Sequence, residues 1–330
     1  MLLTALRRLA IAVPTVLLVL ALTFTALQLA PGDPVRLFLG PGADAAAAGE
    51  LRRQLGLDQP LPVQFAHWLG AFLTGDWGTS IAQQRPVTAV LREALGPTIA
   101  LTGLSLLLSY IGGAAIGLVQ AARSRSRTDV LLTALTSVLQ ALPSYVLALA
   151  LVLLFAYWTA LLGLPEPLRL PAIGAEGISA DLLDPWSRVV DRIRHAALPV
   201  TTLALIGAAG TARYVRAVTA DIARQPFVRA ARSRGLGERS VLVRHALRIA
   251  LLPLVTLAGL QLPALFSGVV FVEAIFAWPG MGRVAVGAVL ARDIPVVLAV
   301  TAVFAMLVVL GNLLADMAAW LLDPRTRGRA

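Results

Sequence analysis

The chain of 330 residues is 58% hydrophobic, has a mean hydropathy of +0.80, and contains 14% charged residues, against about 25% in soluble domains. This composition excludes an ordinary soluble domain and indicates a protein that crosses a membrane several times. The net charge is +10, and the 28 basic residues are all arginine. Because lysine is absent, the chain cannot contain a Walker A loop with its phosphate-binding lysine, and any ATP hydrolysis would belong to another subunit. Cysteine is also absent, which excludes disulfides and thiolate metal sites.

Six apolar segments are long enough to cross a bilayer, which takes about 20 helical residues. We therefore expect an all-α polytopic membrane protein with spans at Leu9–Ala30, Pro97–Ala122, Val130–Leu162, Ala196–Ala212, Ile249–Phe276 and Ile294–Leu322. The first could be a signal peptide, because Arg7 and Arg8 precede it. Its apolar run is longer than the ~7–15 residues of a signal sequence, however, and an uncleaved helix is favoured. Pro143 predicts a kink in the third segment, and Arg213 and Arg216 cut the fourth short.

The arginines indicate the orientation of these spans. With the N-terminus in the cytoplasm, 17 arginines and 5 acidic residues fall on the cytoplasmic side, whereas 11 arginines and 13 acidic residues fall outside. The positive-inside rule favours this arrangement, which places both termini in the cytoplasm. The basic excess is then mainly a topology signal, and no nucleic-acid partner is expected.

Two outer loops are long in this topology. The first, Pro31–Gly96, reads as soluble structure with short amphipathic helical stretches and the aromatic residues Phe65, Trp68, Phe72 and Trp77. Tryptophan at a membrane interface is often only an anchor, which is a sufficient explanation for Trp68 and Trp77. The second, Gly163–Arg194, is rich in proline and glycine, and we expect it to cap the outer mouth.

A basic segment between the fourth and fifth spans, Arg224 to Pro253, holds seven arginines in 30 residues. Pro226 suits the first turn of a helix, where its missing N–H costs nothing. Gly235 can take the left-handed conformation that ends a helix. A helix of about nine residues is therefore expected between them, and it is too short to be stable without a partner.

This short helix has one small apolar face, formed by Phe227, Ala230 and Ala231 at helical spacing. Arginines project around that face, at Arg229, Arg232 and Arg234. Such a helix could lie on anionic lipid with its arginines at the headgroups, or it could dock on another protein. The residues alone leave both readings open.

Polar residues inside the spans are candidates for a solute path. Gln140 and Gln261 could line such a path by offering hydrogen bonds, or they could make contacts between helices. Glu273, near the outer end of the fifth span, could serve as a gate or docking residue, or it could pair with Arg283 or Arg292 for structure. The histidines are dispersed without metal-ligand spacing, at His67, His195 and His245.

The run RAARSRG…ALLP resembles the EAA loop of the permease subunits of bacterial ABC importers. The residues that match the family motif are Ala230, Ala231, Gly235, Leu252 and Pro253. Arg229 stands where the motif has glutamate, Ala250 stands where it has isoleucine, and the spacer is longer. In these departures the loop resembles those of the dipeptide/oligopeptide/nickel subgroup of the family.

Further motifs extend this resemblance over nearly the whole chain. In order, they are APGDP, LGLDQPLPVQF, GDWGTS, PTIALT, LPSYVLAL, HAALPVTTLAL, VEAIFAWPGMGRVAVGAVLARDIPVV and LLDPRTR. The ordered set resembles the B-type permease, the subunit with the long first periplasmic loop. It implies a type I ABC importer permease fold in the bacterial inner membrane and no catalysis by this chain.

In that family the short cytoplasmic helix docks on an ATPase subunit. The resemblance therefore implies a coupling helix at 225–237, with the docking residues Pro226, Phe227, Arg229, Ala230, Ala231, Arg232, Gly235 and Leu236. It also implies a second, C-type permease, one or two ABC ATPases that use ATP and magnesium, and an extracytoplasmic binding protein. The turn at Trp278–Gly282 would brace the mouth against that binding protein.

The resemblance implies three regions: an N-terminal helix with its periplasmic loop at 1–93, a permease core at 94–323 with a coupling loop at 219–248, and a cytoplasmic tail at 324–330. It does not choose among dipeptides, oligopeptides, nickel chelates, glutathione and related solutes. A secondary transporter would show internal inverted repeats and ionisable residues at the membrane midplane, and a membrane enzyme would show a clustered nucleophile and base; neither pattern is evident.

Overall fold

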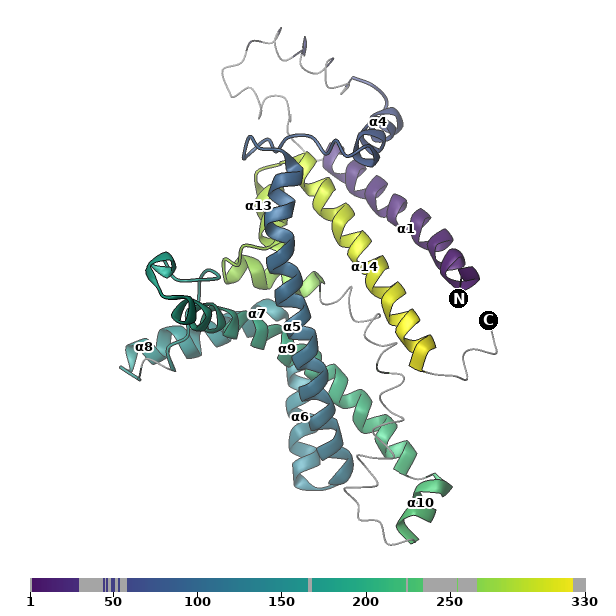
Figure 1. The fold of residues 1–330 in the computed structure, drawn as a ribbon, viewed down its shortest axis with the longest axis vertical. Coiled ribbons are helices and arrows are strands. Elements are labelled where there is room, and N and C mark those ends of the chain that lie inside the picture. Colours follow the sequence, from purple (N-terminus) through teal and green to yellow (C-terminus); the bar gives the residue numbers. More distant parts are fainter. Residues whose placement is uncertain are drawn as a thin grey trace. The chain divides into compact units, whose positions relative to one another are not determined.

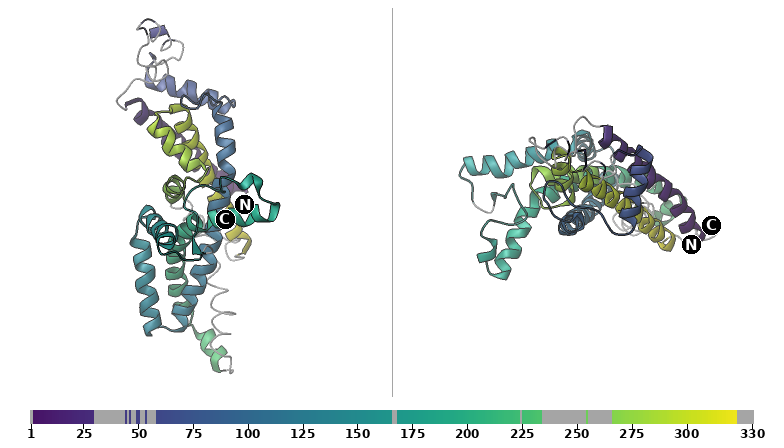
Figure 2. Two further views of the ribbon diagram at one scale, coloured as in Figure 1. Left: turned by 90° about the vertical axis from the view of Figure 1, so that its left-hand side faces the viewer. Right: turned by 90° about the horizontal axis from the view of Figure 1, so that it is seen from above.

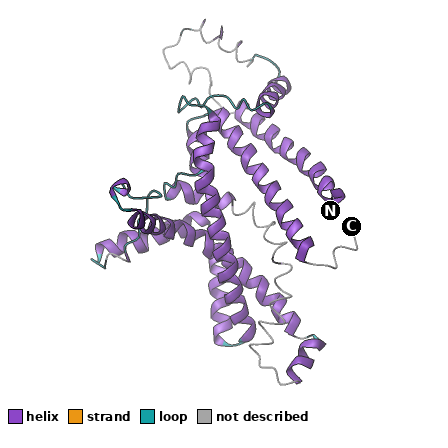
Figure 3. Cartoon of the chain, in the orientation of Figure 1, coloured by secondary structure: helices purple, strands orange, loops and turns teal. Residues whose placement is uncertain are grey.

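Helices make up the regular structure in the part of the chain that is described (Figures 1 and 3). The computed structural model describes residues 2–29, 44, 46, 49–50, 53, 58–165, 168–223, 225–233, 254 and 266–322. The helices are α1 (Leu2–Leu29), α4 (Leu61–Leu73), α5 (Val87–Ala122), α6 (Arg127–Ala141), α7 (Ser144–Val152), η1 (Leu153–Trp158), α8 (Thr159–Leu161), η3 (Ala180–Leu182), α9 (Pro185–Ala223), α10 (Pro226–Ser233), α13 (Met281–Leu290) and α14 (Ile294–Leu322). A further short apolar helix covers Phe266–Ile275.

These elements form two compact units. The larger one is made of Leu95–Arg283 with the end of α14 from Leu310 onward, and the smaller one of Leu2–Ala94 with Val284–Val309. The core of the larger unit is apolar, with Leu101, Leu198 and Phe276 each at most 1% exposed. The larger unit therefore has a packed apolar interior.

Five helices are long and apolar enough to cross a membrane. They cover Ala10–Leu29, Val87–Ala122, Ser144–Leu161, Pro185–Ile222 and Ile294–Ala318. Five of the six predicted spans coincide with these helices. The remaining one, Ile249–Phe276, lies mostly outside the described residues, and its described end is the Phe266–Ile275 helix. The multi-span, all-helical prediction is confirmed, while the count of six stays a prediction.

Small residues let α5 and α9 approach closely in the larger unit. A Cβ built on Gly113 would lie 2.5 Å from the Cβ of Thr211, and one built on Gly117 would lie 2.6 Å from the carbonyl oxygen of Ala212. Ser109 lies one turn before Gly113, and its hydroxyl donates to the carbonyl oxygen of Ala204 at 3.2 Å. Because lipid chains are as apolar as leucine, membrane helices associate through such close packing rather than through a hydrophobic drive.

The kink predicted near Pro143 is confirmed as a break between two helices. Ala141 ends α6, Leu142 is extended, and Ser144 begins α7. Pro143 lacks the N–H that would continue the α6 ladder, and its φ of −58° suits a position just before a new helix. The third predicted span therefore consists of two helical segments, one on each side of the break at Leu142 and Pro143.

The predicted end of the fourth span before Arg213 is wrong. The helix α9 begins at Pro185, within the predicted second outer loop, and continues through Arg213 and Arg216 to Ala223. Each arginine has a partner on α6, because Arg213 donates to the side chain of Gln140 and Arg216 pairs with Asp129. A prediction from hydropathy alone placed the end of this segment too early. Hydropathy does not take account of polar side chains whose hydrogen bonds are made to a neighbouring helix.

The smaller unit contains a continuous series of aromatic rings. Phe24 of α1 contacts Phe65 of α4 with ring centroids 5.6 Å apart. The series continues through Trp68 and Phe72 to Trp77, whose ring stacks on that of Phe72 at 4.7 Å. The amphipathic helix predicted in the first outer loop is thus present as α4, and its aromatic residues pack on α1 and on each other.

Candidate coupling segment and solute-facing hollow

The helix α10 is where the sequence predicts the start of the coupling segment. It begins at Pro226, as predicted, after a tight turn in which the N–H of Gln225 donates to Ile222 O at 2.9 Å. Val228 is fully buried, and α10 contacts α9, whereas the Ala230 side chain is exposed. The sequence analysis did not single out Val228. An apolar residue within a basic helix was the signal that could have indicated that Val228 is buried.

Several predicted docking residues lie beyond what the structure describes. Gly235 and Leu236 are outside the described residues, as is the second helix expected after them. The side chains of four others are likewise not described: Phe227, Arg229, Ala231 and Arg232. Their roles therefore stay predictions.

A bidentate ion pair joins α9 to α6 near the C-terminal end of α9. Arg216 donates from Nε to Asp129 Oδ1 at 2.7 Å and from its terminal nitrogen to Oδ2 at 2.8 Å. Asp129 is 2% exposed, and paired geometry of this kind is the arrangement that makes a buried carboxylate tolerable. The sequence alone did not identify this pair, although an arginine inside an apolar helix was a signal that an acidic partner was required.

The surroundings of Asp129 connect three helices. Ser126 caps α6 by accepting a hydrogen bond from the N–H of Asp129, and the N–H of Arg125 donates to Asp129 Oδ2 at 2.9 Å. Thr133, one turn further along α6, accepts a hydrogen bond of 3.0 Å from Gln120 at the end of α5. The ends of α5, α6 and α9 are therefore held together by side chains within one turn of each other.

A hollow of about 410 Å³ opens at the break between α6 and α7. Twelve residues from three stretches of the larger unit line it: Gln140, Leu142, Pro143, Ser144, Tyr145, Leu203, Ile206, Gly207, Gly210, Ser267, Gly268 and Phe271. Tyr145 and Phe271 face each other with ring centroids 6.1 Å apart, and they are 46% and 50% exposed. The hollow therefore combines apolar rings with small and polar groups.

Gln140 fits both readings that the sequence left open. It lines the hollow, and its side-chain oxygen also accepts a hydrogen bond from Arg213 on α9. Gln261, the second predicted path residue, lies outside the described residues. The structure therefore places one of the two candidate path residues at a cavity.

Glu273 is fully buried, and its partners differ from those expected. The hydroxyl of Thr98 donates to Glu273 Oε1 at 2.7 Å, and the backbone N–H of Gly282 donates to Oε2 at 2.6 Å. The Arg283 guanidinium instead donates to the carbonyl oxygen of Ala277 at 2.7 Å. Within the described residues, a hydroxyl and backbone amides thus replace the expected arginine pairing, because they supply the hydrogen bonds that a buried carboxyl group needs.

Glu273 also holds the turn that the sequence predicted at Trp278–Gly282. The Thr98 hydroxyl accepts from the N–H of Met281 at 2.8 Å, and the Trp278 indole donates to Pro97 O at 3.2 Å. A Cβ on Gly280 would overlap the Glu273 carboxyl group, so a larger residue there would force that group to move. The turn is therefore attached to α5, while its predicted contact with a binding protein stays a prediction.

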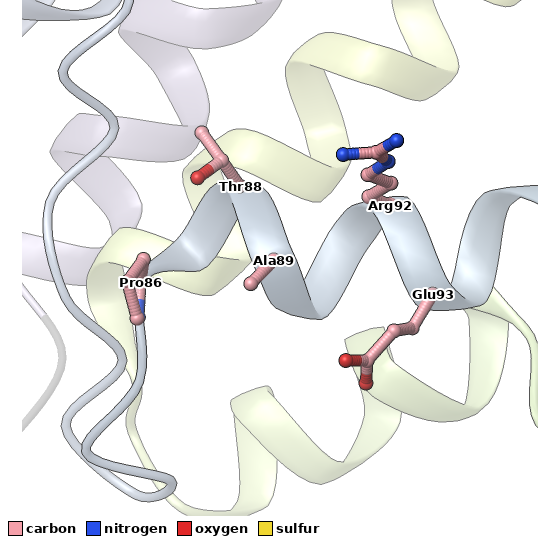
Figure 4. Close-up of a pocket in the computed structure, with 5 residues that line it drawn as sticks. All are labelled: Pro86, Thr88, Ala89, Arg92 and Glu93. Carbon is pink, nitrogen blue, oxygen red and sulfur yellow. The ribbon is translucent and has the colours of Figure 1, made fainter.

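A second hollow, of about 680 Å³, lies beside the first turns of α5 in the smaller unit (Figure 4). Arg92 and Glu93 project to different sides of the helix there, and Glu93 pairs with Arg85. Most of its lining is exposed, and it contains none of the residues that the sequence singled out. This site is an open surface depression rather than an enclosed binding pocket.

Comparison with known proteins places the chain among transport components. Residues 113–328 match the family described as binding-protein-dependent transport system inner membrane component, and residues 1–102 match the N-terminal family of the same systems. The oligopeptide transport system permease protein AppB of Bacillus subtilis is 35% identical over 97% of this chain and 97% of its own length. The glutathione transport system permease protein GsiC of Pectobacterium atrosepticum is 38% identical over 96% of this chain and 95% of its own.

Solved structures support the same fold. The methionine ABC transporter MetNI in inward-facing conformations superposes with a TM-score of 0.53 at 16% identity, covering 72% of this chain and 98% of the other. An amino acid ABC transporter gives a TM-score of 0.50 at 16% identity, covering 70% and 94%. The predicted importer permease fold is thereby confirmed. The chain belongs to the family of inner membrane components of binding-protein-dependent transport systems, and it is a non-catalytic transport subunit.

Proposed function

We propose that this chain forms half of the translocation path of an ATP-driven importer for peptides or a related small solute. The names of both relatives refer to a peptide, an oligopeptide in one and glutathione in the other. They match this chain over nearly their whole length, so the likeness is not confined to a shared module. The hollow at the α6–α7 break is the cavity of the larger unit that such a path would include.

Family membership implies an ATPase and a binding protein as partners. The finer composition that we propose is a second, C-type permease, one or two ABC ATPases, and an extracytoplasmic binding protein that delivers the solute. ATP and magnesium would be used by the ATPases, because this chain has no lysine for a Walker A loop. Energy must then reach this chain through a mechanical contact.

The observation that carries the coupling role is the burial of Val228. Its side chain is fully buried, α10 contacts α9, and Arg216 of α9 is fixed to Asp129 of α6. A push on α10 would therefore move α9 and α6 together rather than bend a loose loop. The segment 225–237, with Phe227 as the residue inserted into the ATPase, would be the coupling helix.

The arrangement of the larger unit is consistent with the proposed topology. The turn between α5 and α6, with Arg123, Arg125 and Arg127, lies at the same end of this unit as α10 (Figures 1 and 2). Two arginine-rich segments at one end agree with a cytoplasmic location for both. We propose that both chain termini are also cytoplasmic, and that the regions 1–93, 94–323 and 324–330 are the outer-loop module, the permease core and the tail.

The test is a detergent pull-down of the tagged chain from its native membrane, with an ATPase assay on the eluate. Wild type should recover a second permease and ATPases. Phe227→Asp should lose the ATPases while keeping normal membrane insertion, because a carboxylate would be buried in an apolar contact. Phe227→Leu is the matched control and should keep them.

A second variant addresses the end of the coupling helix. Gly235→Trp should leave the complex able to hydrolyse ATP but uncouple hydrolysis from uptake. Normal uptake by Phe227→Asp or Gly235→Trp at normal expression would count against the coupling role. Recovery of the chain alone, with uptake on reconstitution, would instead favour a secondary transporter.

A further inference from the structure

We propose that the hollow at the α6–α7 break binds a carboxylate of the passing solute, with Arg213 as the cationic partner. This inference rests on the proposed function and specifies the chemistry of one point on the path. The ligand class is a short peptide, or a similarly sized solute, with a free carboxylate.

The position of Arg213 on α9 brings it to the hollow. Leu203, Ile206, Gly207 and Gly210 line the hollow from successive turns of this helix. Arg213 is three residues beyond Gly210, so it continues the same face by one turn. Its hydrogen bond to Gln140, which also lines the hollow, joins it to the lining on the α6 side.

The charge on Arg213 is not neutralised by its described neighbours. Gln140 is an uncharged amide, and Arg213 has no acidic partner among the residues that the structure describes. Arg216, one turn further along α9, is by contrast paired with Asp129 in bidentate geometry. A cation retained without a counter-charge inside a membrane helix marks a ligand or transport path.

The chemistry of the guanidinium group fits a carboxylate. Arginine has five N–H donors in a planar fork, and a carboxylate accepts two of them in parallel. The hydrogen bond to Gln140 occupies one part of this fork and holds the group in place, while the exposed remainder can bind a ligand. Gln140 is thus the positioning residue, and its amide nitrogen offers a second donor.

The rest of the hollow matches a small peptide in size and surface. Its volume of about 410 Å³ lies within the ~300–1,000 Å³ of small-molecule sites. Tyr145 and Phe271 supply exposed rings against which an apolar side chain can pack. Ser267 and Gly268 are the small residues that line the hollow beside Phe271.

Photo-cross-linking tests the site in the purified complex of permeases and ATPases. The binding protein is left out, so that its selectivity for solutes does not affect the result. The complex with the Phe271→p-benzoylphenylalanine variant is irradiated in the presence of radiolabelled trialanine. Unlabelled trialanine and unlabelled trialanine amide are compared as competitors of this labelling. We expect labelling of this chain, competed at least ten-fold better by the acid than by the amide. Adding Arg213→Gln should reduce labelling at least ten-fold, Arg213→Lys should restore part of it, and the matched exchange Arg123→Gln should leave it unchanged.

Other outcomes separate this proposal from the proposed function. The carboxylate site would be overturned by equal competition from the acid and the amide, or by no labelling. A cross-link only to the second permease would also overturn it, because the hollow would then be covered by protein. If the same preparation couples ATP hydrolysis to peptide uptake, the proposed function survives that result. A chain that purifies without ATPases and shows no ATP-dependent uptake overturns the proposed function instead.

Discussion

Arg216 of α9 donates two hydrogen bonds to Asp129 of α6, at 2.7 and 2.8 Å, and fixes these two helices to each other. The two residues are 87 positions apart in the chain, yet their geometry is that of a planar fork on a carboxylate. In the coupling role proposed above, movement of α10 would reach α6 through this pair.

The first prediction concerns the strength of that pair. Breaking a fully buried pair by removing one partner costs ~3–5 kcal/mol. The Arg216 side chain is 37% exposed, so water screens it, and we expect Asp129→Asn to lower the free energy of unfolding in detergent by only ~1–3 kcal/mol. The double variant Asp129→Leu with Arg216→Leu should be closer to wild type than Asp129→Asn. Wild-type stability of the single variant would show that the pair is not structural.

The second prediction uses two neighbouring glycines of α5. Gly113→Ala should destabilise the protein by ~1–3 kcal/mol, because the new Cβ would lie 2.5 Å from Thr211 and would push α9 away. Gly112→Ala is the matched control, since nothing lies within 4 Å of a Cβ there. Thermal unfolding in detergent measures both, and equal effects would contradict close packing of α5 on α9.

The third prediction concerns the turn held by Glu273. Gly280→Ala should destabilise the protein and expose the Trp278 indole, because the added methyl would displace the Glu273 carboxyl group from its donors. Gly287→Ala on α13 meets no atom within 4 Å and serves as the control. Thermal unfolding and tryptophan fluorescence quenching are the readouts. A Gly280→Ala variant as stable and as well shielded as the control would argue against this arrangement.

The fourth prediction is a pH dependence in the second outer loop. Hydrogen bonds from Arg188 and Arg192 lower the pKa of Glu176 from 4.5 to about 2. A carboxyl group with a lowered pKa contributes stability above its ordinary pKa and loses it as the pH falls toward the lowered value. Hydrogen exchange in residues 174–183 should therefore be unaffected by this group near neutral pH and should gain an extra acceleration between pH 4.5 and 2.

Glu176→Gln provides the control for this pH effect. The amide cannot titrate, so exchange in residues 174–183 should lack the extra acceleration, relative to a reference segment of α9. An identical acid response in the variant and the wild type would mean that Glu176 does not hold the loop through Arg188 and Arg192.

Much of the fold followed from local properties of the chain. Apolar length located five of the spans, because a bilayer core sets a minimum helical length that a sequence can satisfy or fail. Pro143 predicted the helix break, and Pro226 predicted the start of α10, because both effects arise from the missing N–H and the restricted φ of proline. The resemblance over the whole chain identified the family, which the comparisons confirmed.

The sequence by itself thus determined a polytopic helical permease, its family and the start of the helix α10, since these depend on composition, local backbone chemistry and ordered motifs. Only the tertiary structure decided which partner satisfies each polar group inside the spans. Arg216 extended α9 because Asp129 lies opposite it, and Glu273 found Thr98 and backbone amides rather than an arginine. Gln140 became part of a cavity with Arg213 close by. The side-chain pairings join residues 73 to 175 positions apart, so they are a property of how the helices pack and not of any single helix.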